Sequence, residues 1–413
     1  MTSTVMPIQK TAVIGAGTMG RGIVISLANA GLAVQWLDNN PQMLEQGLAS
    51  IAETWAHGVR QGRLDDAQAA ERRACVSPAA DYAALADADL VIEAVYENLA
   101  LKQQIFRDLD ALTKPAAILA SNTSALDIDA IAAVTSRPQQ VLGLHFFSPA
   151  HIMKLLEIVR GAQTAPAVLQ AALALGQRIG KVSVVAGNCP GFIGNRMLRT
   201  YVREARLLLL EGALPRQVDT ALQAFGFAMG PFRMYDVVGI DLEWRARELA
   251  GSGQDEPTVQ VDNRLCALGR FGQKTARGYY QYAEGSRQAE RDPEVDALVV
   301  QVAEQLGFSR RAIDDSEILE RCLLALVNEG AKILEEGIAG SSQDIDLVYL
   351  NGYGFPAATG GPMSWADRQG TADLLARLAV LRQRFGEQWQ AAPLIERLAA
   401  SGQTFASLQQ ARA

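Results

Sequence analysis

The chain has 413 residues, of which 49% are hydrophobic and 20% are charged, and its formal net charge is −7. This length is enough for two or three domains that each bury a core. The negative charge disfavours nucleic acid and anionic membrane surfaces as main partners. No apolar run in the sequence is long enough to cross a bilayer. We therefore expect neither nucleic acid nor a membrane as a partner.

The cysteines indicate the compartment. All four are scattered, without a CxxC pair or a histidine at metal-ligand spacing: Cys75, Cys189, Cys266 and Cys322. Reduced thiols in a cytoplasmic protein are the expected interpretation, and no metal site is predicted. The N-terminus lacks the pattern of a signal peptide, and the final residues Ala411-Arg-Ala413 match no C-terminal targeting signal. The sequence thus predicts a cytoplasmic location.

A glycine-rich loop follows the first predicted strand, residues 10–14. An apolar helical pattern comes after the loop, and a second strand, residues 33–37, ends at Asp38. Strand, glycines, helix, strand and acid in this order are typical of a dinucleotide-binding βαβ unit. The residues predicted to bind the phosphates are Gly15, Ala16, Gly17, Thr18, Met19 and Gly20.

The acid at the end of the second strand selects the cofactor. Asp38 is placed to accept hydrogen bonds from the ribose 2′-hydroxyl, and its charge would repel a 2′-phosphate. The next residues, Asn39 and Asn40, provide no arginine to neutralise that phosphate. The sequence therefore predicts NAD rather than NADP.

Strands and helices continue to alternate up to residue 187. Further strands are expected at residues 88–95, 116–120, 141–147, 152–159 and 182–186, with helices over most of 41–80 and over 165–180. Two of these strands lead into polar residues, Glu93 and the segment Ser121–Ser124. Ligands bind at the carboxyl ends of strands in open α/β sheets. The alternatives are that Glu93 caps the following helix, and that Ser121–Ser124 is an ordinary helix N-cap followed by Asp127.

The stretch from residue 141 to residue 157 is the strongest candidate for the chemistry. His145 is one of three histidines and lies among residues typical of a core, while Glu157 lies on the next apolar run and could face it. An ionisable group in a core needs a partner or a function. From this segment alone, a hydrogen-bonded core histidine is an equally good interpretation. The other histidines are expected to be incidental, since His151 follows the Ser-Pro break and His57 lies in a polar helical stretch.

Helical periodicity dominates after residue 188, and part of it is repeated. Residues 203–212 resemble residues 328–337, and a Gly-Pro pair is followed at the same spacing by Asp236 in one copy and Asp367 in the other. Matched spacing favours a duplication. The alignment pairs Asn195 with Glu320, so the second copy is expected to be structural. We predict a Rossmann-like α/β domain followed by an all-α region, with a domain over 1–187, a first helical domain over 188–284 and a second, degenerate one over 285–413.

Seven ordered motifs resemble the L-3-hydroxyacyl-CoA dehydrogenase family. The likeness is greatest to the dehydrogenase half of multifunctional fatty-acid oxidation enzymes, without their hydratase part. The motifs are Gly15–Gly20, Glu93–Glu97, Ser121–Ser124, Gly143–Pro149, Pro190–Asn195, Met229–Phe232 and Gly272–Tyr279. The resemblance implies an NAD-dependent, reversible oxidation of L-3-hydroxyacyl-CoA to 3-ketoacyl-CoA, in β-oxidation or related acyl-CoA metabolism.

The resemblance also implies roles for individual residues. It makes His145 the general base and Glu157 the group that orients it. Ser124 would hold the reacting oxygen, and Asn195 would reach the substrate oxygens. Residues near the nicotinamide half of NAD would be Glu93, Lys102 and Lys274. Ser148, where many single-function members have asparagine, marks the multifunctional subfamily.

The sequence also suggests an oligomeric state and leaves two alternative functions open. In single-copy relatives the helical domain pairs two subunits, so a second copy implies a monomer through internal duplication, with a homodimer as the alternative. A related dehydrogenase of small free 3-hydroxyacids is the competing enzyme. An NAD-binding structural protein or sensor is the non-enzymatic alternative.

Overall fold

The computed structural model describes residues 7–409, and the chain ends used above to look for targeting signals lie outside this range. The chain divides into two compact units. Unit 1 comprises Met1–Asn195 and Ile333–Tyr353, and unit 2 comprises Arg196–Lys332 and Gly354–Ala413. Within the described range, no helix is long and apolar enough to cross a bilayer. Unit 1 thus contains a piece of the second helical copy, which the sequence did not predict.

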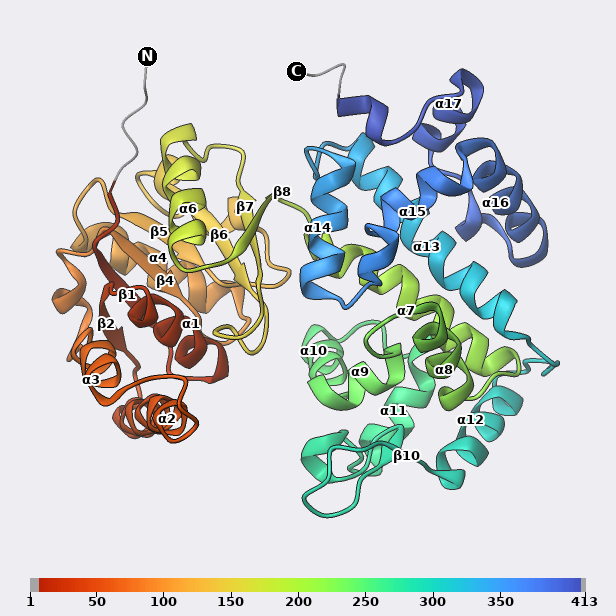
Figure 1. The fold of residues 1–413 in the computed structure, drawn as a ribbon, viewed down its shortest axis with the longest axis horizontal. Helices are drawn as coiled ribbons and strands as arrows, with labels where there is room; N and C mark the ends of the chain where they lie inside the picture. The colour runs from red at the N-terminus through yellow and green to blue at the C-terminus, as the bar shows by residue number, and fades with distance from the viewer. Residues whose placement is uncertain (1–6, 410–413) are drawn as a thin grey trace. The chain divides into compact units, whose positions relative to one another are not determined.

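Unit 1 is built on one sheet, whose described strands run in the order β3-β2-β1-β4-β5-β6-β7-β8 (Figure 1). The strands are β1 (Lys10–Ile14), β2 (Ala33–Leu37), β3 (Val76–Pro78), β4 (Leu90–Glu93), β5 (Ile118–Ser121), β6 (Val141–Phe146), β7 (Leu155–Arg160) and β8 (Val182–Gly187). Neighbours are parallel except β6 and β7, which pair antiparallel. The predicted Rossmann-like domain is confirmed.

Helices cover this sheet because their apolar faces need a partner. They are α1 (Thr18–Asn29), α2 (Pro41–Arg60), α3 (Asp66–Ala74), α4 (Leu99–Leu112), α5 (Ile128–Ala132), α6 (Pro166–Arg178) and, from the second copy, α14 (Ser342–Gly352). The core includes Val13 and Ile92 from the strands. Ile23 and Leu27 of α1 pack in the same core, and all four side chains are fully buried. Burial on both faces explains why these strands are almost continuously apolar.

Two features of the strands depart most from the prediction, and the other expected strands agree with the structure to within two residues at each end. The short β3 lies within the stretch expected to be helical, because a three-residue edge strand paired only with β2 has too few residues to show a pattern. β7 begins at Leu155 rather than at residue 152, since Ile152 is 66% exposed in the turn after β6. Apolar composition alone does not separate a strand from an adjoining turn.

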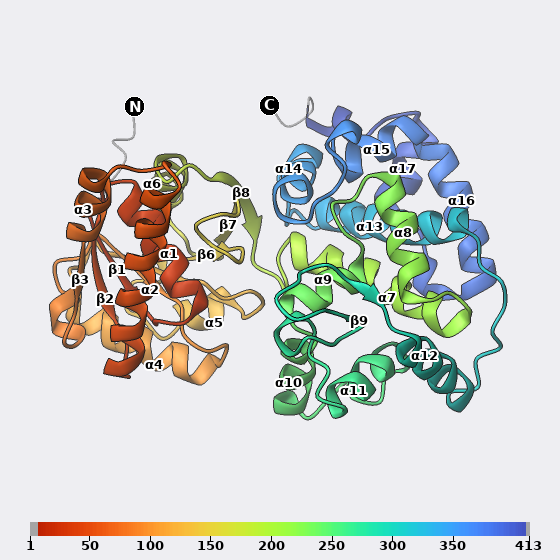
Figure 2. The same ribbon diagram turned by 60° about the horizontal axis from the view of Figure 1, so that its bottom comes forward.

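Unit 2 is largely helical. Its helices are α7 (Gly194–Glu211, which begins in unit 1), α8 (Pro215–Phe225), α9 (Pro231–Val238), α10 (Asp241–Ala250), α11 (Gln260–Ala267), α12 (Pro293–Gln305), α13 (Asp315–Glu335, whose last turn lies in unit 1), α15 (Pro362–Gln369), α16 (Thr371–Phe385) and α17 (Pro393–Ser401). The predicted helical region is confirmed, and it includes one short pair of strands. An antiparallel ribbon forms from β9 (Tyr280–Gln281), labelled in Figure 2, and β10 (Glu290–Arg291). Two-residue strands are too short to produce alternation in the sequence.

The two helical copies hold a turn in the same way. The carboxylate of Asp236 accepts the backbone N–H groups of Tyr279 and Tyr280, at 2.8 and 2.9 Å. The carboxylate of Asp367 accepts those of Phe405 and Ala406, at 2.8 and 3.0 Å. The aspartates that the sequence aligned therefore make the same contacts, which supports the proposed duplication.

Candidate active site

The predicted site residues gather at one edge of the sheet. β4, β5 and β6 are parallel neighbours, so their carboxyl ends meet there, and antiparallel β7 brings its first residues to the same edge. In this register His145 on β6 lies directly opposite Glu157 on β7. Directly opposed residues in an antiparallel pair project their side chains from the same face. The sheet topology thus brings together two residues that the sequence could only suggest were near.

His145 and Glu157 form a buried hydrogen-bonded pair. The distance from Nδ1 of His145 to Oε2 of Glu157 is 2.8 Å, and the two side chains are 7% and 0% exposed. An ionised carboxylate only accepts hydrogen bonds, so Nδ1 is assigned as the protonated nitrogen. The other ring nitrogen, Nε2, then has a lone pair with which to take a proton. This is the arrangement of a general base and the group that orients it.

The second oxygen of Glu157 is held by the start of α7. Oε1 accepts the N–H groups of Ile193 and Gly194, at 3.2 and 3.0 Å. The preceding Phe192 has a φ of +52°, a left-handed conformation that is unusual for a residue other than glycine. Phe192 is 0% exposed, and its ring centroid lies 5.7 Å from that of His145. This strained turn directs two successive amides at one carboxylate.

Ser124 is held by an acid that the sequence analysis did not single out. Oε1 of Glu97 accepts from the backbone N–H of Ser124 at 2.9 Å, from its hydroxyl at 3.3 Å, and from the Thr123 hydroxyl at 2.5 Å. Nζ of Lys102 lies 3.4 Å from the other oxygen of Glu97. The available signal was its place in the Glu93–Glu97 motif, just after a predicted strand. Glu97 fixes the position of Ser124.

Asn195 joins the same cluster. Its Nδ2 lies 3.4 Å from the carbonyl oxygen of Ser124. The adjacent Gly194 donates to Glu157, as described above. The structure therefore links all four predicted catalytic residues, Ser124, His145, Glu157 and Asn195, within unit 1.

Glu93 and Lys102 form a buried ion pair of 2.7 Å, with side chains 0% and 1% exposed. The Glu93 carboxylate also accepts the Val95 N–H and the Ser121 hydroxyl, both at 2.7 Å. These contacts tie together β4, β5 and α4. Glu93 does not cap the following helix, because Asn98 accepts the Leu101 N–H at the start of α4.

The segment Ser121–Ser124 is not a helix N-cap either. Asp127 is the N-cap of α5, and its carboxylate accepts the N–H groups of Asp129 and Ala130. The N-cap interpretation placed the cap several residues too early, because a short polar run contains more than one possible N-cap residue. The hydroxyl groups of Ser121–Ser124 are instead held at the end of β5 by the carboxylates of Glu93 and Glu97.

The glycine-rich loop has the shape that a pyrophosphate requires. Gly15 has a φ of +108°, and a β-carbon there would lie 2.5 Å from the Ala94 oxygen. A β-carbon at Gly20 would overlap the Gly15 carbonyl, whereas one at Gly17 would meet no atom within 4 Å. α1 begins at Thr18, followed by Met19, so unpaired N–H groups of its first turn adjoin this open position. These residues fit NAD.

The remaining predicted cofactor contacts lie in different units. Asp38, at the end of β2, accepts the N–H groups of Ala16 at 2.6 Å and of Asn40 at 2.8 Å, so the acid is fixed beside the loop. Lys274 belongs to unit 2, where its amine forms an ion pair with the buried carboxylate of Asp241. The Lys274 side chain is 48% exposed.

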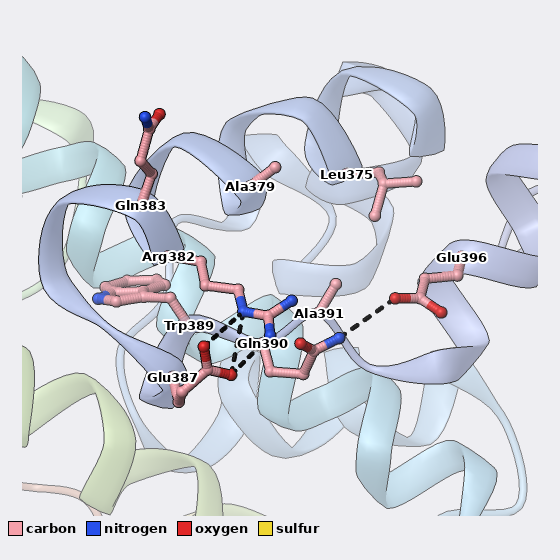
Figure 3. A pocket seen from close by; sticks show the side chains of 9 residues that line it. All are labelled: Leu375, Ala379, Arg382, Gln383, Glu387, Trp389, Gln390, Ala391 and Glu396. Atoms are coloured by element: carbon pink, nitrogen blue, oxygen red, sulfur yellow. Dashed lines mark hydrogen bonds and ion pairs between the residues drawn. The ribbon is translucent and has the colours of Figure 1, made fainter.

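A pocket of about 360 Å³ in unit 2 is separate from these residues (Figure 3). It is lined by Leu375, Ala379, Arg382, Gln383, Glu387, Trp389, Gln390, Ala391 and Glu396. Arg382 pairs with Glu387 at 2.6 Å, and Gln390 donates to Glu396 at 3.3 Å. Its charged side chains are thus engaged with other lining residues, and none of the predicted site residues lines it.

Comparison with known protein families identifies the family of the chain. The NAD-binding domain of 3-hydroxyacyl-CoA dehydrogenase matches residues 10–189, and the C-terminal domain of the same enzyme matches residues 191–282 and 318–408. The chain belongs to the 3-hydroxyacyl-CoA dehydrogenase family. Its first 189 residues therefore include the NAD-binding domain of that family.

Individual relatives agree with this assignment. The chain is 45% identical over 417 residues to the peroxisomal bifunctional enzyme of Danio rerio, covering 96% of this chain and 56% of that protein. The chain thus spans about half the length of the curated relatives that it matches. A 3-hydroxybutyryl-CoA dehydrogenase from Escherichia coli superposes with a TM-score of 0.82 at 28% identity, covering 99% of this chain and 100% of that one. The dehydrogenase part of multifunctional enzyme 1 from C. elegans superposes with a TM-score of 0.68 at 28% identity, covering 95% of this chain and 90% of that one.

Proposed function

We propose that this protein catalyses the reversible, NAD-dependent oxidation of L-3-hydroxyacyl-CoA to 3-ketoacyl-CoA. The observation that carries the proposal is the buried His145–Glu157 pair, at 2.8 Å, beside Ser124 and Asn195. The E. coli relative, which is named as acting on 3-hydroxybutyryl-CoA, matches along its whole length and supports this class of substrate.

Each residue has a distinct part in the proposed mechanism. Nε2 of His145 removes the proton of the 3-hydroxyl, and Glu157 stabilises the imidazolium that forms. Ser124 and the Nδ2 group of Asn195 hold the substrate oxygens in place. The glycine-rich loop and Asp38 bind NAD, which supplies the hydride acceptor for C3.

The first test measures NADH oxidation by the purified chain with acetoacetyl-CoA as substrate. We expect His145→Gln to lower kcat by about 10² to 10⁴, because the base is lost. The matched control is His57→Gln, since His57 is exposed on α2 and contacts only the neighbouring Gln61 in its described hydrogen bonds. An active His145→Gln variant would refute the assignment of the base.

A second variant tests the orienting acid. In Glu157→Gln the amide oxygen would still face the N–H groups of Ile193 and Gly194, so the amide nitrogen would face His145. That arrangement makes Nδ1 an acceptor and moves the proton to Nε2, where it blocks proton abstraction. We expect a folded protein with kcat lowered on the order of 10⁴-fold. Unchanged kinetics would reduce Glu157 to a structural partner.

The acyl chain-length preference follows from kcat/KM values for 3-ketoacyl-CoA substrates of increasing length. The same measurements with free 3-ketoacids separate this activity from that of a dehydrogenase of small free acids. Activity on the free acids alone would contradict the proposed substrate class.

We further propose that the helical region is a duplicated domain and that the chain is a monomer. The two matches to one C-terminal domain and the shared aspartate contacts support the duplication. Light scattering should give one chain mass, 44.4 kDa, and twice that mass would indicate a homodimer.

We propose a cytoplasmic location because the four cysteines are scattered in the sequence and form no CxxC pair. The peroxisomal name of the Danio relative favours a different compartment. Fractionation of the native host cells distinguishes the two compartments, because the protein would be recovered either with the cytoplasm or with the peroxisomes.

A further inference from the structure

One helix of the second copy is part of the unit that carries the catalytic cluster. The N–H of Gly187, at the end of β8, donates to the carbonyl of Ile338 at 2.7 Å, just before α14. At the other end of α14, a β-carbon on Gly352 would lie 2.5 Å from the Leu155 side chain of β7. Contacts at both ends fix α14 against the strands that carry and neighbour Glu157.

The residue that ends α14, Tyr353, reaches the catalytic cluster. Its hydroxyl donates to Oδ1 of Asn195 at 2.8 Å. Its ring meets the edge of Phe147 at a centroid distance of 5.6 Å, and the Phe147 ring lies 4.4 Å from that of His145. A β-carbon on Gly194 would overlap the Tyr353 ring, so the glycine before Asn195 makes room for it.

This contact fixes which face of the Asn195 amide is offered to a substrate. A carbonyl oxygen only accepts hydrogen bonds, so the amide nitrogen of Asn195 must be the atom that faces the Ser124 carbonyl, at 3.4 Å. The amide oxygen is then the atom held by Tyr353. With its oxygen engaged in this way, Asn195 presents an N–H donor on the Ser124 side, and rotation of the amide by 180° would set its oxygen against the Ser124 carbonyl and require the Tyr353 hydroxyl to accept instead of donate.

The first copy has no such hydroxyl at the matching place. The sequence Tyr353-Gly-Phe355 of the second copy corresponds to Phe225-Gly-Phe227 of the first, so the first copy keeps the ring and lacks the hydroxyl. The hydroxyl of Tyr353 is thus not a feature that both copies need in order to fold. We propose that Tyr353 is a positioning residue of the active site, which orients Asn195 toward the substrate oxygens; this rests on the function proposed above.

The test compares Tyr353→Phe with Tyr349→Phe in the full chain. Tyr349 stacks on Tyr353 at 4.9 Å, and its hydroxyl donates to the Gly194 carbonyl rather than to the Asn195 side chain. Both variants keep the ring and lose one hydroxyl on the same helix. We expect Tyr353→Phe to lower kcat/KM for acetoacetyl-CoA about three- to tenfold, with NADH affinity and Tm unchanged. Tyr349→Phe should retain most of the activity.

A double-mutant cycle separates positioning from packing. If Tyr353 acts through Asn195, the Tyr353→Phe change should have almost no effect in an Asn195→Ala background. Equal losses in the two tyrosine variants, or additive losses with Asn195→Ala, would overturn the inference.

Crystal structures of the wild type and Tyr353→Phe provide a readout that does not depend on activity. We expect the Asn195 amide to turn away from its wild-type orientation in the variant. An unchanged amide would overturn the role of Tyr353. Inactivity of the wild-type chain toward acetoacetyl-CoA would instead refute the proposed function.

Discussion

The first helix of each copy, α7 in one and α13 in the other, contacts its counterpart through two equivalent ion pairs. Arg196 of the first copy contacts Glu329 of the second at 2.7 Å, and Arg321 of the second contacts Glu204 of the first at 3.1 Å. The same shift in numbering relates the two arginines and the two glutamates. Reciprocal contacts of this kind are the mark of a twofold interface between identical surfaces.

The two equivalent ion pairs nevertheless differ in how deeply they are buried and in what else they contact. The Arg321 side chain is 0% exposed, also contacts Glu211 at 2.6 Å, and lies over the ring of Phe385. The Arg196 side chain is 20% exposed. In a homodimer one mutation changes both halves of an interface, whereas in a duplicated chain each half mutates alone. The difference teaches that duplication keeps the framework and lets the two copies specialise.

The largest effect is expected on stability. Arg321→Met leaves the buried Glu204 with only Arg203, a partner whose side chain is 40% exposed, so we expect the free energy of unfolding to fall by about 3 to 5 kcal/mol. Arg196→Met, at the more exposed pair, should cost only about 1 kcal/mol. Urea unfolding of both variants makes the comparison. Equal losses would mean that the two halves of the interface are still energetically equivalent.

The starts of the two helices differ in chemistry. Asn195 → Ala removes the donor proposed to bind substrate oxygens, and we expect kcat/KM to fall by about 10². The aligned Glu320 forms an ion pair of 2.9 Å with Arg377. Glu320→Ala should therefore leave kcat/KM within about twofold, since it removes only a partly exposed pair. Comparable losses of activity would show that the second copy also contributes its helix start to catalysis.

The smallest expected effect is a difference in pH dependence. Burial raises the pKa of Asp219, in the first copy, to about 7, although hydrogen bonds from Tyr280 and from backbone N–H groups lower it. A folded pKa above the unfolded value of 3.8 means that the stabilising contribution is present at low pH and is lost as pH rises through about 7. We expect the unfolding free energy to fall as the pH rises from about 4 to about 7, and this slope to be shallower in Asp219→Asn, by roughly 1 kcal/mol over the range.

The second copy provides the comparison for that experiment. Burial also raises the pKa of Asp236, to about 6, and that of Asp367, its counterpart in the second copy. Asp367→Asn should change the slope less than Asp236→Asn, because Asp367 is only partly buried. A larger change in the second copy would reverse the assignment of the titrating group.

Local signals in the sequence predicted the fold well where they were strong. The bounds expected for β1 and β2 agree with the structure, because glycines and an acid delimit these two strands. The sequence also suggested that His145 and Glu157 could face each other, but the antiparallel register that pairs them depends on the whole sheet. Glu97 and Tyr353 escaped prediction because their partners, Ser124 and Asn195, are distant in the chain, and local periodicity carries no information on such pairs.

The hydrogen bonds from Ile193 and Gly194 to Glu157 have a consequence for protein engineering. These amides stand at the start of α7, so the positive end of an 18-residue helix lies at the carboxylate that orients His145. The orientation of the base therefore depends on where a helix begins, 37 residues after Glu157 in the chain. A residue inserted between Gly191 and Gly194 would keep every predicted catalytic side chain in the sequence and still displace the amides that hold the orienting acid.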